Sequence, residues 1–216
     1  MQYEIIKSKR KTMAISIKHD GMVVIRVPLQ TSATNINDLI QKYQHWIDKK
    51  LAEIKSRKKD TGAIYFLGEP YRLILLEGDS PVIQVIADTI KVYAYSKEGY
   101  QLKLINWYKE HVKNIVQPLI VKYQNLYALK PEKVKITKAK GRWGSCSSKG
   151  TISFSYRLMM LPPFVIEYIV VHELAHLKEL NHSPRFWTLV ASMCPEYKVA
   201  EKWLKNHRYL LADLFI

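Results

Sequence analysis

The stretch that decides the fold reads Val170-Val171-His172-Glu173-Leu174-Ala175-His176-Leu177-Lys178-Glu179-Leu180-Asn181-His182. It contains the pattern H-E-x-x-H, and another histidine, His182, follows six positions later. Side chains four positions apart lie on the same face of a helix, so His172 and His176 can offer two imidazoles to one metal ion. Glu173 is rotated by about 100° around the helix axis and can reach a metal-activated water without being a ligand. If the chain then turns back, His182 supplies a third ligand and one position stays open, as in a catalytic zinc site.

The alternative is a buried helix whose histidines are incidental. Residues 164–171 are nearly all apolar, which predicts a core helix. Polar side chains buried on such a helix need partners, and a metal is the simplest one. If His182 is not the third ligand, Glu196 and Glu201 are the next candidates.

The composition is that of an ordinary globular protein. The chain has 216 residues, with 48% hydrophobic and 25% charged residues. Its apolar runs are too short to span a bilayer, and the first residues lack the features of a signal peptide. Cys146 and Cys194 form no C-x-x-C pair, so we expect neither a disulfide framework nor a cysteine zinc site. We therefore expect a cytoplasmic protein without a membrane partner.

The formal net charge is +15. Such an excess favours polyanionic partners, for example nucleic acid, nucleotides or an anionic surface. The alternative is that lysine is simply common on this surface. The oligomeric state does not follow from the sequence.

Residues 1–98 read as a β-rich region with one long helix. Residues 13–18 and 22–27 predict a hairpin, and residues 36–58 predict a helix capped by Thr34 or Asn35. Four short strands between 64 and 95 fit a meander, with turns at 78–81 and Asp88. This region shows no catalytic pattern, so we expect it to act as a scaffold or to place substrate.

Residues 99–216 read as the catalytic region, which begins with a long helix over 100–127 and a strand over 133–138. The following segment, 138–150, is basic and rich in Gly and Ser. It lacks the Walker A spacing, but its backbone N–H groups could face an anion, assisted by Lys140, Arg142 and Lys149. The alternative is an ordinary connector. Cys146 is a weaker candidate for a nucleophile, since nearby basic residues can lower a thiol pKa.

A strand at 151–155 precedes the metal helix, and its edge could pair with an extended peptide. Tyr156 and Arg157 follow it and could bind substrate or an oxyanion, although Tyr156 could equally be packed. After His182, Ser183 and Pro184 predict the start of a further helix, and a last helix is expected over 196–211.

Two motifs together carry a family resemblance: Arg-Trp-Gly-Ser-Cys-Ser-Ser-Lys-Gly at 142–150, and the stretch from Val170 to Trp187. They resemble the YgjP-like family of metal-dependent hydrolases, which is related to the SprT-like and WLM-type minimal zinc metallopeptidases. The resemblance implies that His172, His176 and His182 bind zinc and that Glu173 is the general base. The family often has Asn-Trp-Arg-Leu where this chain has Ser155-Tyr156-Arg157-Leu158, so only the arginine and leucine are retained.

We therefore expect an α+β fold, in which a small N-terminal sheet with one helix precedes a minimal zincin-like helical domain with a short sheet. The expected function is zinc-dependent hydrolysis at an H-E-x-x-H-x5-H site, with one Zn²⁺ or another divalent metal per chain. A peptide or protein is the leading substrate. The alternatives are a nucleoside triphosphate phosphohydrolase and a DNA-associated protease of the SprT-like type.

Overall fold

The computed structural model describes residues 3–18, 21–58, 63–78 and 82–211. Residues 19–20, between the two strands of the predicted hairpin, and most of the predicted turn at 78–81 lie outside this range. The chain divides into two compact units, Met1–Thr61 and Gly62–Ile216. The sequence predicted a boundary at 98/99 instead, and the packing within the second unit explains the difference.

The N-terminal unit is a three-stranded sheet with one helix. Its elements are β1 (Tyr3–Ser8), β2 (Ala14–Ile17), β3 (Val23–Pro28) and α1 (Ala33–Lys58). The predicted hairpin is confirmed, because β2 pairs antiparallel with β3. β1 adds to the other edge of β3 in parallel, and apolar residues of α1 cover the sheet. The helix begins earlier than predicted, since the Ser32 hydroxyl accepts the hydrogen bond from the Asn35 backbone N–H.

This unit also has an apolar pocket of about 310 Å³, lined by Met13, Ala14, Ile15, Leu39, Tyr43 and Trp46. None of the residues predicted to form the site lies in it.

The second unit begins with a four-stranded sheet followed by a long helix. The strands are β4 (Ala63–Phe66), β5 (Glu69–Leu76), β6 (Ile83–Ile86) and β7 (Thr89–Tyr93), and the helix is α2 (Lys97–Tyr127). The strand order is β4-β5-β7-β6, with β5 and β7 parallel, so the expected meander is wrong. Ile90 and Val92 of β7 share a buried core with Leu104 and Tyr108 of α2. Because this sheet packs on α2, it belongs to the second unit.

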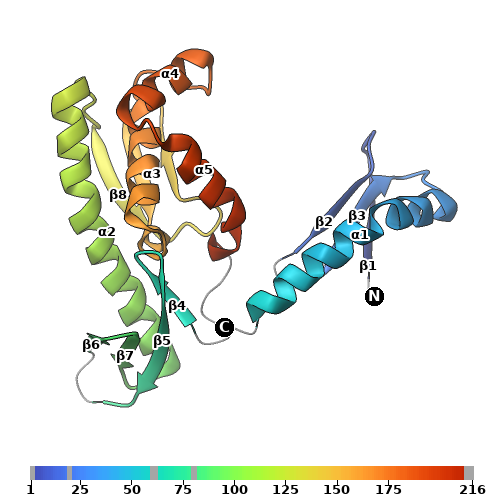
Figure 1. Cartoon of the computed structure of the whole chain (residues 1–216), viewed down its shortest axis with the longest axis horizontal. Coiled ribbons are helices and arrows are strands. Elements are labelled where there is room, and N and C mark those ends of the chain that lie inside the picture. The colour runs from blue at the N-terminus through green and yellow to red at the C-terminus, as the bar shows by residue number, and fades with distance from the viewer. Residues whose placement is uncertain (1–2, 19–20, 59–62, 79–81, 212–216) are drawn as a thin grey trace. The chain divides into compact units, whose positions relative to one another are not determined.

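The rest of the second unit builds the surroundings of the site. Its elements are β8 (Lys133–Thr137), β9 (Gly144–Cys146), β10 (Thr151–Ser155), the 3₁₀ segment η1 (Tyr156–Met160), α3 (Pro163–Ala175), α4 (Pro184–Met193), α5 (Tyr197–Asn206) and η2 (Arg208–Leu211). The expected last helix over 196–211 is thus divided into α5 and η2. Within this unit, Figure 1 shows α3 beside α2, with α4 at one end of α3 and α5 along it. The expected α+β fold class is confirmed.

A tight turn at Gly68 fixes the first sheet against the start of α3. Gly68 has φ of +90°, and a Cβ there would lie 2.8 Å from the Cβ of Pro162. The preceding Leu67 donates its backbone N–H to the carbonyl of Met159 at 2.6 Å. The turn between β4 and β5 therefore supports the residues that lead into α3.

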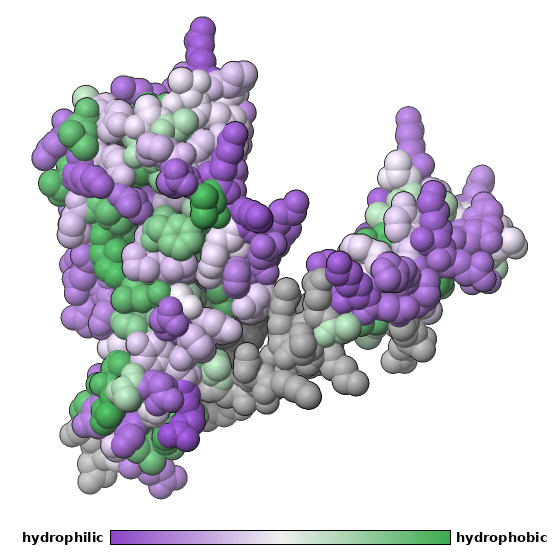
Figure 2. Space-filling model, in the orientation of Figure 1, coloured by the Kyte–Doolittle hydropathy of each residue, from purple (hydrophilic) through white to green (hydrophobic). Residues whose placement is uncertain are grey.

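No helix among the described residues combines the length and the apolar character that crossing a membrane requires. On the face shown in Figure 2, hydrophilic residues are widespread and hydrophobic residues form interrupted patches.

Candidate metal centre

Helix α3 carries the first half of the candidate site. It begins at Pro163, whose fixed φ suits the first helical position, and most of its apolar side chains are buried. His172 and Glu173 lie near its last turn, and His176 is the C-cap residue. Backbone hydrogen bonds from Leu177 and Lys178 then close a turn that directs the chain toward His182. The helix therefore ends where a third ligand can approach the first two.

The three histidines converge. One ring nitrogen from each of His172, His176 and His182 lies within 4.8 Å of the others. The Nε2 atoms of His172 and His182 are 3.1 Å apart. Two nitrogens that bind one tetrahedral zinc ion at about 2.0–2.1 Å lie about 3.3 Å apart, so this spacing fits a shared metal ion.

The second ring nitrogen of two of these histidines is hydrogen-bonded. His176 Nδ1 lies 2.9 Å from the backbone carbonyl of Glu179. A carbonyl only accepts, so Nδ1 carries the proton and Nε2 keeps its lone pair for the cluster. His172 Nδ1 lies 3.3 Å from the Tyr168 hydroxyl. Such contacts are typical of metal-binding histidines, because they fix the ring and its tautomer.

Aromatic side chains of α4 pack against the three imidazole rings. Phe186 is fully buried, and its ring centroid lies 4.6–4.9 Å from those of the three histidines. Ser183 caps α4 by accepting from the Phe186 backbone N–H, which confirms the predicted helix start. Burial, and then the charges of His176 and His182, lower the pKa of His172 from 6.5 to about 3. Burial also lowers the pKa of His176, so both rings are neutral at pH 7, as metal ligands must be.

Glu173 is a buried carboxyl group on the same helix as His172 and His176. Its side chain is only 7% exposed, and burial raises its pKa from 4.5 to about 7 against the opposing charge of Arg142. Its Oε2 atom is buried and has no hydrogen-bond partner within the described part of the chain. A Cβ on Gly144 would lie 2.6 Å from Glu173 Oε1, so the carboxylate occupies the space that this glycine leaves open.

The edge of the sheet beside α3 is β9, not β10. The strand order is β8-β10-β9, so β10 is paired on both sides and its predicted role as a free edge is wrong. Hydrogen bonds from Ser155 to Trp143 and from Ser147 to Thr151 fix the register of β9 against β10. In an antiparallel pair the intervening residues point outward, so the N–H and C=O groups of Gly144 and Cys146 face the outer edge. This edge lies next to Glu173.

Of the residues predicted to bind substrate or an anion, some lie near the candidate site and others lie in the hydrophobic core. Arg142 is exposed and close enough to Glu173 to lower its pKa, whereas Lys149 lies in the turn beyond β9. Tyr156 is 3% exposed and its ring is 6.2 Å from that of Tyr108, so it is a core residue. Arg157 is 1% exposed, beside the Tyr156 ring, and is likewise remote from solvent.

Cys146 does not have the environment that the sequence suggested. Burial, and then the charge of Glu173, raise the pKa of its thiol instead of lowering it. The basic residues Arg142 and Lys149 of this segment are exposed. The thiol is therefore a poor nucleophile at neutral pH.

Two functional features were missed by the sequence analysis. Gly144 contacts Glu173. The one feature of the sequence that could have revealed it is its place in the Gly/Ser-rich segment. Tyr168 contacts His172, and the signal that could have revealed it is the spacing of four positions on one helix. Its hydroxyl also lies 3.3 Å from Oε1 of Glu201, which links that residue to the site through Tyr168.

Comparisons with known proteins identify the family of the chain. Residues 11–207 match the model of the YgjP-like, metallopeptidase domain family. Curated proteins provide no match. Among solved structures, the metallopeptidase zymogen abylysin of Pyrococcus abyssi is 31% identical over 48% of this chain and 95% of that chain, with a TM-score of 0.34. The family match spans both units of the chain and contains every residue of the candidate site, so the chain belongs to the YgjP-like metallopeptidase family.

Proposed function

We propose that this chain hydrolyses peptide bonds, with one Zn²⁺ held by His172, His176 and His182 and with Glu173 as the general base. The observation that carries the proposal is the convergence of three imidazole nitrogens within 4.8 Å, next to a buried carboxylate. Another divalent metal could occupy the same nitrogens, but imidazole ligands in a tetrahedral arrangement suit zinc well.

When bound, the metal would supply Lewis acidity that lowers the pKa of a water from 15.7 to about 7 and polarises the substrate carbonyl. The chain supplies the proton transfer. Glu173, whose pKa burial raises to about 7, accepts the proton of the attacking water. The same carboxyl group then donates it to the departing amine. A base with a pKa near the working pH is best suited to both steps.

The outer edge of β9 supports a peptide as the substrate. An extended peptide that pairs with the outward main-chain groups of Gly144 and Cys146 would run past Glu173. Its scissile carbonyl could then approach the three histidines. The pairing uses main-chain groups, so it would accept peptides of varied sequence.

The segment 138–150 gives less support to a nucleoside triphosphate. Gly144–Cys146 form a strand, and the N–H groups of Ser147 and Gly150 donate to the carbonyls of Thr151 and Ser147. Arg142 and Lys149 lie at opposite ends of that strand. A phosphate cradle would need these N–H groups and basic side chains to converge on one point.

The test compares the zinc-loaded wild type with Glu173→Gln on unfolded protein, on nucleoside triphosphates, and on unfolded protein with duplex DNA present. We expect new peptide N-termini with the wild type and none with the variant. Phosphate release that is lost in the variant would replace this proposal with the phosphohydrolase. Cleavage only in the presence of DNA would replace it with the DNA-associated protease.

A further inference from the structure

Tyr168 connects the metal centre to helix α5. It lies one helical turn before His172 and is 4% exposed. Its hydroxyl oxygen is 3.3 Å from His172 Nδ1 and 3.3 Å from Oε1 of Glu201, which α5 contributes. These contacts form a chain from an imidazole through a hydroxyl to a carboxylate.

When Glu201 is ionised, only one arrangement of protons satisfies both contacts of the Tyr168 hydroxyl, the one with His172 and the one with Glu201. A tyrosine hydroxyl has one proton to donate, and an ionised carboxylate only accepts. The hydroxyl therefore donates to Glu201 and accepts from His172 Nδ1–H. With the proton on Nδ1, the lone pair of His172 is on Nε2, the atom that lies 3.1 Å from Nε2 of His182.

We propose that Tyr168 and Glu201 are a positioning pair that fixes the tautomer and ring orientation of His172 and thereby strengthens metal binding. The inference rests on the proposed metal site and adds a role for α5, which supplies no ligand. It also gives Glu201 a function other than the direct ligation that its sequence position had suggested.

The pair acts on a ligand whose Nδ1 contact is made by a side chain. His176 is oriented by the backbone carbonyl of Glu179, which no side-chain substitution removes. His172 depends on a side-chain hydroxyl that in turn depends on another side chain. Substitution of Tyr168 or Glu201 should therefore change the properties of this one imidazole and leave His176 in place.

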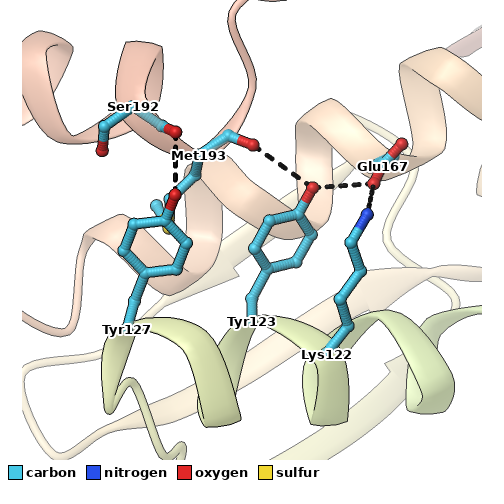
Figure 3. A network of polar contacts seen from close by, with 6 residues as sticks. All are labelled: Lys122, Tyr123, Tyr127, Glu167, Ser192 and Met193. Atoms are coloured by element: carbon cyan, nitrogen blue, oxygen red, sulfur yellow. Dashed lines mark hydrogen bonds and ion pairs between the residues drawn. The ribbon is translucent and has the colours of Figure 1, made fainter.

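The chain contains a matched control. Tyr123 of α2 donates to the Glu167 carboxylate at 2.7 Å and thus joins two helices in the same way, as Figure 3 shows. Figure 3 also draws Lys122, Met193, Tyr127 and Ser192 around this contact, and none of the residues drawn is a histidine. Tyr123→Phe removes a tyrosine–glutamate hydrogen bond without a contact to the metal centre.

The experiment measures Zn²⁺ affinity in the full chain by competition with a chromophoric chelator, together with the visible absorption spectrum of the Co²⁺ form. For Tyr168→Phe we expect zinc affinity to fall by about 10–100-fold, as when other hydrogen-bond partners of metal-binding histidines are removed, with an altered Co²⁺ spectrum. Glu201→Gln should cause a smaller loss in the same direction. Since the two residues act in series, the double variant should resemble Tyr168→Phe.

Tyr123→Phe should keep wild-type zinc affinity and spectrum even if its thermal stability falls. Wild-type affinity and an unchanged spectrum in both Tyr168→Phe and Glu201→Gln would overturn the inference. Equal losses in Tyr123→Phe and Tyr168→Phe would also overturn it, because they would indicate a general loss of stability. Failure of the wild type to bind one Zn²⁺ would instead overturn the proposed metal site itself.

Discussion

The carboxylate of Glu173 can occupy its place only because residue 144 has no side chain. A Cβ at Gly144 would lie 2.6–2.9 Å from three atoms of the Glu173 side chain, Oε1, Cγ and Cδ. In Gly144→Ala, Glu173 must therefore move. A displacement of about 1 Å at a catalytic group can cost about 100-fold in rate, so we expect kcat/KM for peptide cleavage to fall by that order with zinc content unchanged.

Gly141→Ala is the control for this substitution, because a Cβ there would meet nothing within 4 Å. It should retain wild-type kcat/KM. Wild-type activity in Gly144→Ala would mean that the position of Glu173 does not matter to the reaction.

His182 is exposed and lies in the segment between α3 and α4. We expect it to be the third of the three metal ligands. His182→Ala should weaken zinc binding by more than the roughly 10–100-fold that results when a metal-binding histidine loses its hydrogen-bond partner. Competition with a chelator measures this, and His207→Ala is the control, since His207 stacks on Trp203 outside the cluster. Unchanged stoichiometry and affinity in His182→Ala would place the third ligand elsewhere.

Residues of the candidate site could be predicted from the sequence where they lie close together along the chain. His172, Glu173 and His176 follow from helical spacing, and His182 needs only one turn. Gly144 and Glu201 reach the site through strand pairing and helix packing between segments distant in sequence. The same reason explains Tyr156, whose burial depends on Tyr108 of α2.

At the level of elements, α2 and α3 are held together by a group of polar contacts around Glu167 (Figure 3). Lys122 and Tyr123 lie 2.8 and 2.7 Å from its Oε1 atom. The hydrogen bond from Lys122, and then that from Tyr123, lower the pKa of Glu167 below 4.5 despite its partial burial. The ionised carboxylate therefore stabilises the folded state.

The lowered pKa predicts how this contribution depends on pH. The stabilisation by the ionised Glu167 is fully present above the unfolded-state pKa of about 4.5. It is lost as the pH falls through the lower pKa of the folded state. At pH 7, Glu167→Gln should reduce the free energy of unfolding by roughly 0.5–1 kcal/mol, since the group is partly solvated. Urea titrations of both proteins should show this difference shrinking below pH 4.5. A difference that grows on acidification would contradict the assignment.

The helices and the β2–β3 hairpin were predictable because periodicity and turn residues are local signals. The pairing of strands was not. β5 pairs with β7 in parallel although β6 lies between them in sequence, and β9 takes the edge beside β10. The hydrophobic pattern of a strand reports which face is buried, but not which strand is its neighbour.

At the level of the whole molecule, the division at 61/62 places the β4–β7 sheet in the unit that contains the candidate metal centre. The predicted boundary at 98/99 followed the change from strands to a long helix in the sequence. That change does not show whether the sheet packs on the helix that follows it. Ile90 and Val92 share a core with α2, so the sheet contributes to the support of α3.

The net charge of +15 should influence which peptides bind. A field of one sign attracts substrates of the other sign, and salt screens the attraction. We expect KM for an acidic peptide to be lower than that for a basic peptide of equal length, and to rise with added NaCl while kcat stays constant. Steady-state kinetics at several salt concentrations measure this. A KM independent of both peptide charge and salt would show that the excess charge does not serve substrate binding.

In the proposed reaction, three histidines hold the metal and one carboxylate moves the proton. The most direct test measures zinc content and peptide cleavage in the same preparations of wild type and Glu173→Gln. We predict one zinc ion per chain in both proteins, with cleavage only in the wild type. Cleavage by Glu173→Gln at the wild-type rate would contradict the account, as would a wild type that cleaves peptides without bound metal.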